Sequence, residues 1–319
     1  IFTRLTPEAR KLFDPRDDPI LNYLDDDGRS IEPEFYLPVI PMVLVNGTEG
    51  IGTGFSCYVP PFSEVDIKAN LRNLMNGVEL KKMKPFFRGF KGSILEQDDD
   101  SWMTQGVWQS IGTTVKVTEL PPGRWTQDFK EHLDTLVEKK VISSYTNNST
   151  TDDVNFLIQA YAGEDLVKDL KLQKVIRCSN MNLFHPTRGI QKYETPEQIL
   201  RDFFQLRMEY YKKRKANLIE DIRSKSNITS QRARFIHAVV NEEIRVFKKR
   251  KRDLEDEMTT RKFPKVDRTY DYLLNTRTVD YTEERVAAMN EEAERLRKQL
   301  ARIEATSCNE MFENDLKNI

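Results

Sequence analysis

The spacing of apolar residues changes at Thr195, and this change divides the chain into two parts. Before it, apolar residues come in short runs, and "TTVKVTEL" (113–120) alternates as a half-buried strand does. After it, apolar residues recur at helical intervals of 4, 3 and 4, at Ile199, Phe203, Leu206 and Tyr210. We therefore predict an α+β fold, with antiparallel strands and peripheral helices in residues 1–195 and long helices in residues 196–319.

The C-terminal part begins with a clear helix start. Thr195 is a capping residue, Pro196 occupies the first helical position, and Gln198 stands three residues after the cap. We expect a helix of about 25 residues or more from there, a second from Thr229 to Met258, and a last long helix near the C-terminus. The last helix has a heptad seam, typical of a coiled coil, at Val286, Met289, Ala293, Leu296, Leu300 and Ile303.

The second of these expected helices contains five consecutive basic residues, "KKRKR" (248–252), which leave two interpretations open. They are a nuclear-import signal or the exposed basic face of the long helix expected there. Pro264 then breaks the chain, and a short helix is expected around "YDYLLN" (270–275).

The N-terminal part contains patterns for individual elements. The apolar run "FYLPVIPMVLV" (35–45) holds two prolines that remove ladder donors, so we expect an extended edge or buried strand. Ser63 has capping-box spacing and starts a helix. A second amphipathic helix is expected over 124–140 with Thr126 as its cap, and "KLQKVIRCSNMNLFH" (171–185) is expected to form a strand pair.

One stretch is dense in glycine. "VNGTEGIGTGFS" (45–56) places four glycines within eight residues, with Ile51 between two of them. Such density indicates a sharp turn or a backbone that closely approaches something else. The spacing is not a dinucleotide fingerprint and no Lys-Ser/Thr follows it, which argues against a nucleotide-binding loop. From the residues alone, the simplest interpretation is a tight turn with Ile51 in the core.

A second unusual stretch is "KKMKPFFRGFK" (81–91), which interleaves five basic residues with three phenylalanines and has no acid. It is either a solvated loop beside an aromatic core or a patch that contacts phosphates.

The totals exclude few functions. Lys+Arg number 50 and Asp+Glu 51, and a net charge of −1 neither implies nor excludes nucleic acid as a partner. Cys57, Cys178 and Cys308 lie far apart, which fits a reducing compartment and argues against a disulfide framework or a zinc site. The three histidines are equally scattered and are predicted to be structural or surface residues. No apolar run approaches about 18 residues, and no signal peptide is visible. The first residue is Ile1 rather than methionine, so we expect a fragment or a processed piece.

The sequence resembles the breakage-reunion region of eukaryotic type IIA DNA topoisomerases. The resemblance is carried by "EPEFYLPVIPMVLVNGTEGIGTGFS" (32–56) and extends along essentially the whole chain. The other matching runs are "IFTRL" (1–5), "RGFKG" (88–92), "ELPPGRWTQDFKE" (119–131), "QILRDFFQLRMEYYKKRK" (198–215) and "YDYLLN" (270–275). These runs are long and stand in the order of the family, which makes the match specific.

The resemblance implies a domain organisation. Residues 1–195 would be the mixed α/β tower domain, with the last residues of the winged-helix domain at its start. Residues 196–319 would be the coiled-coil arm and the small helical C-gate, through which two copies pair. We expect the seam from Val286 to Ile303 to pack within the arm, and the region around Tyr270–Asn275 and the chain end to meet the second copy.

The resemblance also implies site residues. The isoleucine of the family's "EGIGTG" inserts between base pairs and bends the gate DNA, which gives Ile51 the role of an apolar wedge. The residues expected to contact DNA are Gly50, Gly52, Thr53, Arg88, Lys91, Lys171, Lys174, Arg177, Ser179 and Asn180.

The family's catalytic groups are expected outside this chain. The nucleophilic tyrosine would stand immediately before Ile1, and the metal-binding carboxylates and the ATPase domain would lie upstream. We therefore expect no catalytic residue, metal or cofactor in this chain, which alone should be inactive, and Mg²⁺ and ATP in the complete enzyme. The implied partners are double-stranded DNA, a second copy of the chain and the upstream domains, with no membrane, in the nucleus.

Two other functions stay open. One is a non-catalytic topoisomerase II-like DNA-bending paralogue or natural fragment; an Arg-Tyr pair immediately upstream of Ile1 would support the enzyme, and any other residue there would support this alternative. The other is a nucleotide-binding enzyme that uses the loop of Gly50, Gly52 and Gly54, which the spacing disfavours.

Overall fold

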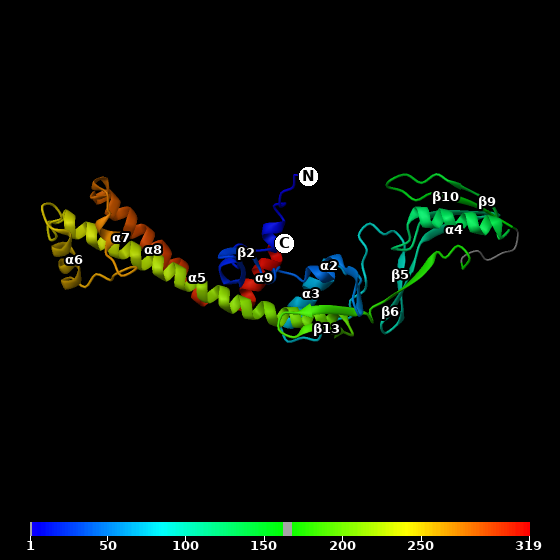
Figure 1. The fold of residues 1–319 in the computed structure, drawn as a ribbon, viewed down its shortest axis with the longest axis horizontal. Coiled ribbons are helices and arrows are strands. Elements are labelled where there is room, and N and C mark those ends of the chain that lie inside the picture. Colours follow the sequence, from blue (N-terminus) through cyan, green and yellow to red (C-terminus); the bar gives the residue numbers. More distant parts are fainter. Residues whose placement is uncertain (1, 162–167) are drawn as a thin grey trace. The chain divides into compact units, whose positions relative to one another are not determined.

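The computed structural model describes residues 2–161 and 168–319. The chain forms two compact units, one of Ile40–Leu206 and one that joins Ile1–Val39 to Arg207–Ile319 (Figure 1). The fold is α+β, as predicted, with antiparallel sheets and one very long helix. None of the helices that the structure describes combines the length and low polarity needed to cross a lipid bilayer.

The Ile40–Leu206 unit is built on two antiparallel sheets. One has the strand order β7 (Val107–Ile111), β8 (Thr114–Glu119), β10 (Phe156–Ala160), β9 (Ile142–Asn147), and the other has the order β11 (Gln173–Arg177), β6 (Ser101–Gln105), β5 (Ser93–Asp98). Helix α4 (Thr126–Glu138) packs on the first sheet, where the rings of Phe129 and Phe156 meet edge to face at 5.0 Å. These buried apolar side chains form the main core of the unit.

Shorter elements complete this unit. They are helices α2 (Met42–Asn46) and α3 (Glu64–Met75), and the hairpins β3 (Thr48–Gly52) with β4 (Phe55–Val59) and β12 (Met181–His185) with β13 (Gly189–Tyr193). Ser63 caps α3 as predicted, because its hydroxyl accepts a hydrogen bond from the Val65 amide at 3.2 Å.

The other unit is mainly helical. Its short elements are α1 (Ala9–Leu12), η1 (Asp18–Ile20), β1 (Tyr23–Asp26), β2 (Arg29–Pro33), α7 (Asp271–Leu274) and η2 (Thr278–Asp280). Its long elements are α5 (Pro196–Val240), whose first residues belong to the other unit, α6 (Lys251–Thr260), α8 (Glu283–Ala305) and α9 (Cys308–Asn318). The predicted seam on α8 faces inward, since Met289, Ala293 and Leu296 are buried.

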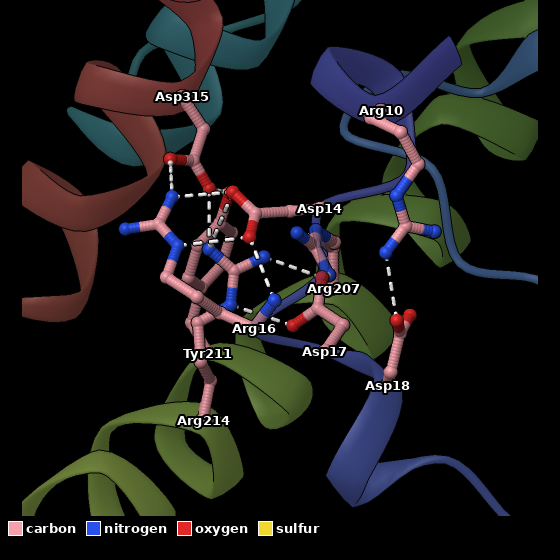
Figure 2. Close-up of polar contacts among 9 residues, drawn as sticks. All are labelled: Arg10, Asp14, Arg16, Asp17, Asp18, Arg207, Tyr211, Arg214 and Asp315. Atoms are coloured by element: carbon pink, nitrogen blue, oxygen red, sulfur yellow. Dashed lines mark hydrogen bonds and ion pairs between the residues drawn. The ribbon is translucent and has the colours of Figure 1, made fainter.

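A buried ionic network joins the two ends of the chain within this unit (Figure 2). Arg214 on α5 is fully buried; its Nε donates to Asp17 Oδ1 at 2.6 Å and its Nη1 donates to Asp315 Oδ2 at 2.5 Å. Arg207 Nη1 donates to Asp17 Oδ2 at 2.8 Å, and Tyr211 Oη donates to Asp315 Oδ2 at 2.8 Å. Asp17 precedes η1 and Asp315 lies on α9, so α5 connects two segments that stand about 300 residues apart along the chain. Arg16 also pairs directly with Asp315 and joins the same two segments.

Asp14 lies at the edge of this network. Burial raises the pKa of its carboxyl, but hydrogen bonds from Arg16 and the positive charge of Arg214 outweigh burial and hold that pKa below its usual value. The carboxylate is therefore ionised at neutral pH and adds to the pairing.

One helix prediction was wrong in the C-terminal part, and with it one interpretation of the basic run 248–252. The helix expected from Thr229 to Met258 is absent, because α5 continues to Val240 and the chain then reverses before α6. The reversal is held by the buried side chain of Ile244, whose amide donates to the Ala238 carbonyl at 3.0 Å. The basic run 248–252 consequently lies in this connection and at the start of α6, so it is not the face of a long helix.

Three local predictions in the N-terminal part also need correction. The run 35–45 is no strand, because Pro41 occupies the N-cap of α2 and the chain turns helical at Met42. The N-cap of α4 is Trp125, and Thr126 is the first helical residue. The two strands of 171–185 do not pair with each other: β11 pairs with β6, and β12 pairs with β13.

Candidate nucleic-acid interface

The glycine-rich stretch is a β-hairpin, formed by β3 and β4. Ile51 pairs with Ser56 and Gly52 pairs with Phe55, so Thr53 and Gly54 form the two-residue connection. Gly54 has φ +92°, in the left-handed region that favours glycine. The tight turn expected in this stretch is therefore present, and it joins two regular strands that were not predicted from the sequence.

Ile51 lies on this hairpin next to the turn, and its side chain is 93% exposed. This exposure excludes the interpretation in which Ile51 belongs to the core. Its neighbours Gly50 and Gly52 carry no side chain, and open space surrounds the position that a Cβ of Gly50 would take. The isoleucine thus projects from a narrow backbone that another molecule can approach closely.

The base of the hairpin depends on a further glycine. Gly47 has φ +68°, and a Cβ there would stand 2.7 Å from the carbonyl oxygen of Val59. Both constraints exclude a side chain at this position, so Gly47 sets how the hairpin leaves α2.

A groove of about 840 Å³ lies beside the hairpin. Four of the predicted DNA contacts line it, namely Lys174, Arg177, Ser179 and Asn180. The structure thereby brings the basic strand β11 and the base of the β3–β4 hairpin, which are far apart in sequence, to one surface. The groove is open and polar, which suits an extended ligand rather than an enclosed small molecule.

The remaining predicted cations lie elsewhere on this unit. Phe87 rather than Arg88 lines the groove. Arg88 is 87% exposed and forms an ion pair with Glu64 at 3.3 Å, and Lys91 forms one with Asp153 at 3.3 Å. Exposed pairs of this kind contribute only about 0–1 kcal/mol, so both cations can exchange their partner for a phosphate. Lys171 is exposed in the turn before β11.

The prediction missed several residues that line the groove. Among them are Glu49 and Tyr58, which face each other across the hairpin. Burial raises the pKa of Tyr58, and the charges of Glu49 and Cys178 raise it further, so its hydroxyl stays protonated. If the stretch had been recognised as a strand, the alternation of side chains along it would have placed Tyr58 on the same face of β4 as Ser56.

Comparison with known proteins shows the family to which the chain belongs. The family of DNA gyrase and topoisomerase IV A-type subunits matches residues 1–317. Mitochondrial DNA topoisomerase 2 of Dictyostelium discoideum is 34% identical over 336 residues, which cover 100% of this chain and 26% of that protein. DNA topoisomerase 2 of Arabidopsis thaliana is 39% identical over 280 residues, which cover 82% of this chain and 19% of that protein.

A solved structure of the Plasmodium falciparum topoisomerase II DNA-binding, cleavage and re-ligation domain has the same fold. It matches 100% of this chain and 48% of its own chain, with a TM-score of 0.88 and 33% sequence identity. The chain belongs to the eukaryotic type II DNA topoisomerases. It spans about a quarter or less of the length of the two curated topoisomerases described above.

This topoisomerase chain offers no evident metal site in its described part. Across residues 2–161 and 168–319, no group of three or more His, Cys, Asp or Glu side chains is placed to hold a metal ion. The histidines make local contacts instead: His132 Nε2 lies 2.6 Å from the Asp169 carbonyl oxygen, and His185 contacts Thr187 and Arg188.

Proposed function

We propose that this chain supplies the DNA-gate binding and bending surface, and the C-gate dimerisation part, of an ATP-dependent type II DNA topoisomerase. Such an enzyme passes one duplex through a transient double-strand break in another. The observation that carries the proposal is the exposed Ile51 on a glycine-flanked hairpin beside a groove lined by Lys174 and Arg177. In this proposal residues 1–195 are the tower domain with the end of the winged-helix domain, and residues 196–319 are the arm and C-gate.

Ile51 acts as the wedge in this mechanism. An apolar side chain that enters between two base pairs unstacks one step at a cost of a few kcal/mol, and the bent duplex regains this energy by contacting more protein. Gly50 leaves room for the groove walls of the DNA beside the inserted side chain, whereas the ring of Phe55 lies 3.3 Å from the position that a Cβ of Gly52 would take. A hairpin presents the wedge more rigidly than a loop would, because its backbone amides and carbonyls are paired.

The cations hold the duplex against the wedge. Lys174 and Arg177 on β11 contact phosphates along the groove, and the exposed cations Arg88, Lys91 and Lys171, which lie outside the groove lining, contact further phosphates. Neutralised phosphates supply most of the sequence-independent affinity. Binding therefore follows how easily a sequence bends more than its base edges.

The complete enzyme supplies the remaining chemistry in this proposal. In this proposal Mg²⁺ and ATP act in other domains of the enzyme. This chain binds and bends DNA, and a double-strand break also requires a nucleophile and a metal to stabilise phosphate charge. We place the complete enzyme in the nucleus, because its proposed substrate is chromosomal DNA.

The proposed phosphate contacts predict a change in salt dependence. Replacing Arg88 and Lys91 together by alanine should weaken binding of the complete protein to linear duplex. The slope of log K against log salt is negative, and each lost phosphate contact makes it less steep by about 0.9. The slope of the double variant should therefore be less steep by about 1.8. A titration at several salt concentrations measures the slope.

A matched control removes the same charge elsewhere. Lys130 and Lys139 are exposed on α4 and at its end, outside both the groove lining and the basic run 81–91 that holds Arg88 and Lys91. Their double alanine variant should keep the slope of the unaltered protein. Equal slopes for both double variants would contradict phosphate contacts by Arg88 and Lys91.

The dimer interface is proposed to include the region around Tyr270–Asn275 and the chain end. Tyr270 and Leu273 are buried in the core of their own unit, and Asp315 on α9 is bound to α5. Their side chains are thus occupied within one copy. We extend the proposed C-gate contact to Phe247 and Val279, two large apolar residues of the same helical region that are 76% and 73% exposed.

Charge at this position should weaken the dimer. Replacing Val279 by aspartate buries a charge in the proposed two-fold interface, and we expect the dimer to dissociate at about tenfold or more higher concentration. Sedimentation velocity over a concentration series measures this. Ile111→Asp, on the exposed face of β7 in the other unit, is the control and should leave association unchanged. An unchanged dimer in Val279→Asp would place the interface elsewhere.

A further inference from the structure

The β3–β4 hairpin has little core of its own to fix its direction. All five residues of β3 are exposed, and of β4 only Val59 is buried. A two-stranded hairpin without a hydrophobic face is marginally stable in water. Contacts with neighbouring elements must therefore decide where Ile51 points.

A polar cluster, which we call the asparagine clamp, joins this hairpin to β12. It consists of Ser56, Asn180 and Asn182. Asn182 Nδ2 donates to the Ser56 carbonyl oxygen at 2.8 Å and to Asn180 Oδ1 at 3.0 Å. Asn180 Nδ2 donates to Ser56 Oγ at 2.9 Å. The bonding requires the Asn182 amide nitrogen in this orientation, because the reversed amide would set its oxygen against two other oxygens.

The clamp holds the strand directly behind the wedge. Ser56 is the register partner of Ile51 across the hairpin. Side chains of directly opposed residues lie on one face of a strand pair, about 5 Å apart at Cβ. Two residues further along β4, the Tyr58 amide donates to the Asn180 carbonyl at 2.8 Å. Asn180 therefore also binds β4 through a main-chain hydrogen bond.

The other side of the clamp is anchored in the unit. On β12, Met181 is fully buried and pairs with Tyr193 of β13. The Tyr193 hydroxyl donates to Asp202 of α5 at 3.0 Å. Burial and this hydrogen bond raise the pKa of Tyr193 to about 12, so the hydroxyl remains a donor at neutral pH. The hairpin is thus connected through β12 and β13 to the start of α5.

We propose that Asn182 is a positioning residue for DNA bending: through Ser56 and Asn180 it sets the direction in which the hairpin presents Ile51. This inference rests on the proposed function of Ile51. It also gives Asn180 a place in the support of the hairpin, because its amide is bonded to Ser56 Oγ.

Replacement of Asn182 by leucine tests the clamp in the complete protein. Leucine has a similar shape and no charge, but it cannot donate to Ser56 or Asn180. Loss of one net hydrogen bond changes an equilibrium constant about fivefold, so the ratio of bent to straight DNA should fall about five- to tenfold. Affinity for linear duplex and its salt dependence should change less than about twofold, because the cations remain. Bending is measured by energy transfer between the ends of a short duplex.

Three comparisons make the result specific. Gln191→Met removes an amide from β13, in the strand pair next to Asn182, and should bend DNA normally. The double variant Ile51→Ala with Asn182→Leu should bend no less than Ile51→Ala alone, because the clamp acts through the wedge. Ser56→Ala removes only the bond from Asn180, and it should give a smaller loss of bending even if Asn182→Leu melts early.

The outcomes separate this inference from the proposed function. Normal bending by a folded Asn182→Leu, or an additive loss in the double variant, would overturn the positioning role. If Asn182→Leu melts early, normal bending by Ser56→Ala would overturn it. Normal bending by Ile51→Ala would instead overturn the wedge itself.

Discussion

Replacing Ile51 by alanine is expected to abolish most of the DNA bending and to leave most of the affinity for linear duplex. The variant removes the atoms that keep the base step open and retains the cations. Because opening the step involves a few kcal/mol, the ratio of bent to straight DNA should fall tenfold or more. In the complete enzyme, cleavage should fall with bending, since the scissile phosphates reach the nucleophile and the metal only on bent DNA in the proposed mechanism.

The stability of this variant provides a second criterion. Ile51 is almost fully exposed, so its truncation should change the free energy of unfolding by less than about 0.5 kcal/mol. A core isoleucine would lose about 2–5 kcal/mol. End-to-end energy transfer and a melting curve on the same sample measure both quantities. Ile111→Ala, at another exposed isoleucine, is the control and should alter neither. Unchanged bending by Ile51→Ala would refute the wedge.

Replacing Arg214 by methionine is expected to release α9 from α5. Arg214 is the buried donor shared by Asp17 and Asp315, which are themselves 3% and 4% exposed. Without it, two buried carboxylates lose a cation, a change that typically costs about 3–5 kcal/mol. Arg207 still pairs with Asp17 and Tyr211 still donates to Asp315, so we expect the lower end of this range.

Hydrogen exchange on the complete protein detects this release. A loss of about 3 kcal/mol corresponds to about 150-fold faster exchange of the amides of Cys308–Asn318. Arg223→Met is the control on the same helix, because Arg223 is exposed and pairs with Glu304 at 2.9 Å, where a pair contributes at most about 1 kcal/mol. Adding Asp17→Asn and Asp315→Asn to Arg214→Met should restore part of the protection. Unchanged exchange in Arg214→Met would show that apolar packing alone holds α9.

Most helix starts could be predicted from the sequence because they depend on local capping residues. Ser63 and Pro196 begin helices as expected, and α8 carries the predicted inward seam. The boundary between α5 and α6 was not readable in the same way. It depends on Ile244 being buried in a core that forms only after the chain reverses, and the helical spacing continues through the reversal.

Part of the candidate site could also be predicted, because local sequence patterns mark some of its residues. Glycine density and a bare Ile51 mark an unusual backbone, and the clusters around Arg88 and Lys174 mark cations. Which of these side chains meet depends on strand pairing. β11 pairs with β6 rather than with its sequence neighbour β12, and this pairing brings Lys174 and Arg177 to the groove.

Local spacing and long matching runs were enough to predict the α+β class, the two parts with different periodicity, the family and the wedge candidate. The contacts of Asn182 with the hairpin and of Arg214 with Asp17 and Asp315 became visible only in the folded chain. An asparagine or a buried arginine has no periodic signature, because its role depends on donors and acceptors that folding brings from distant parts of the chain.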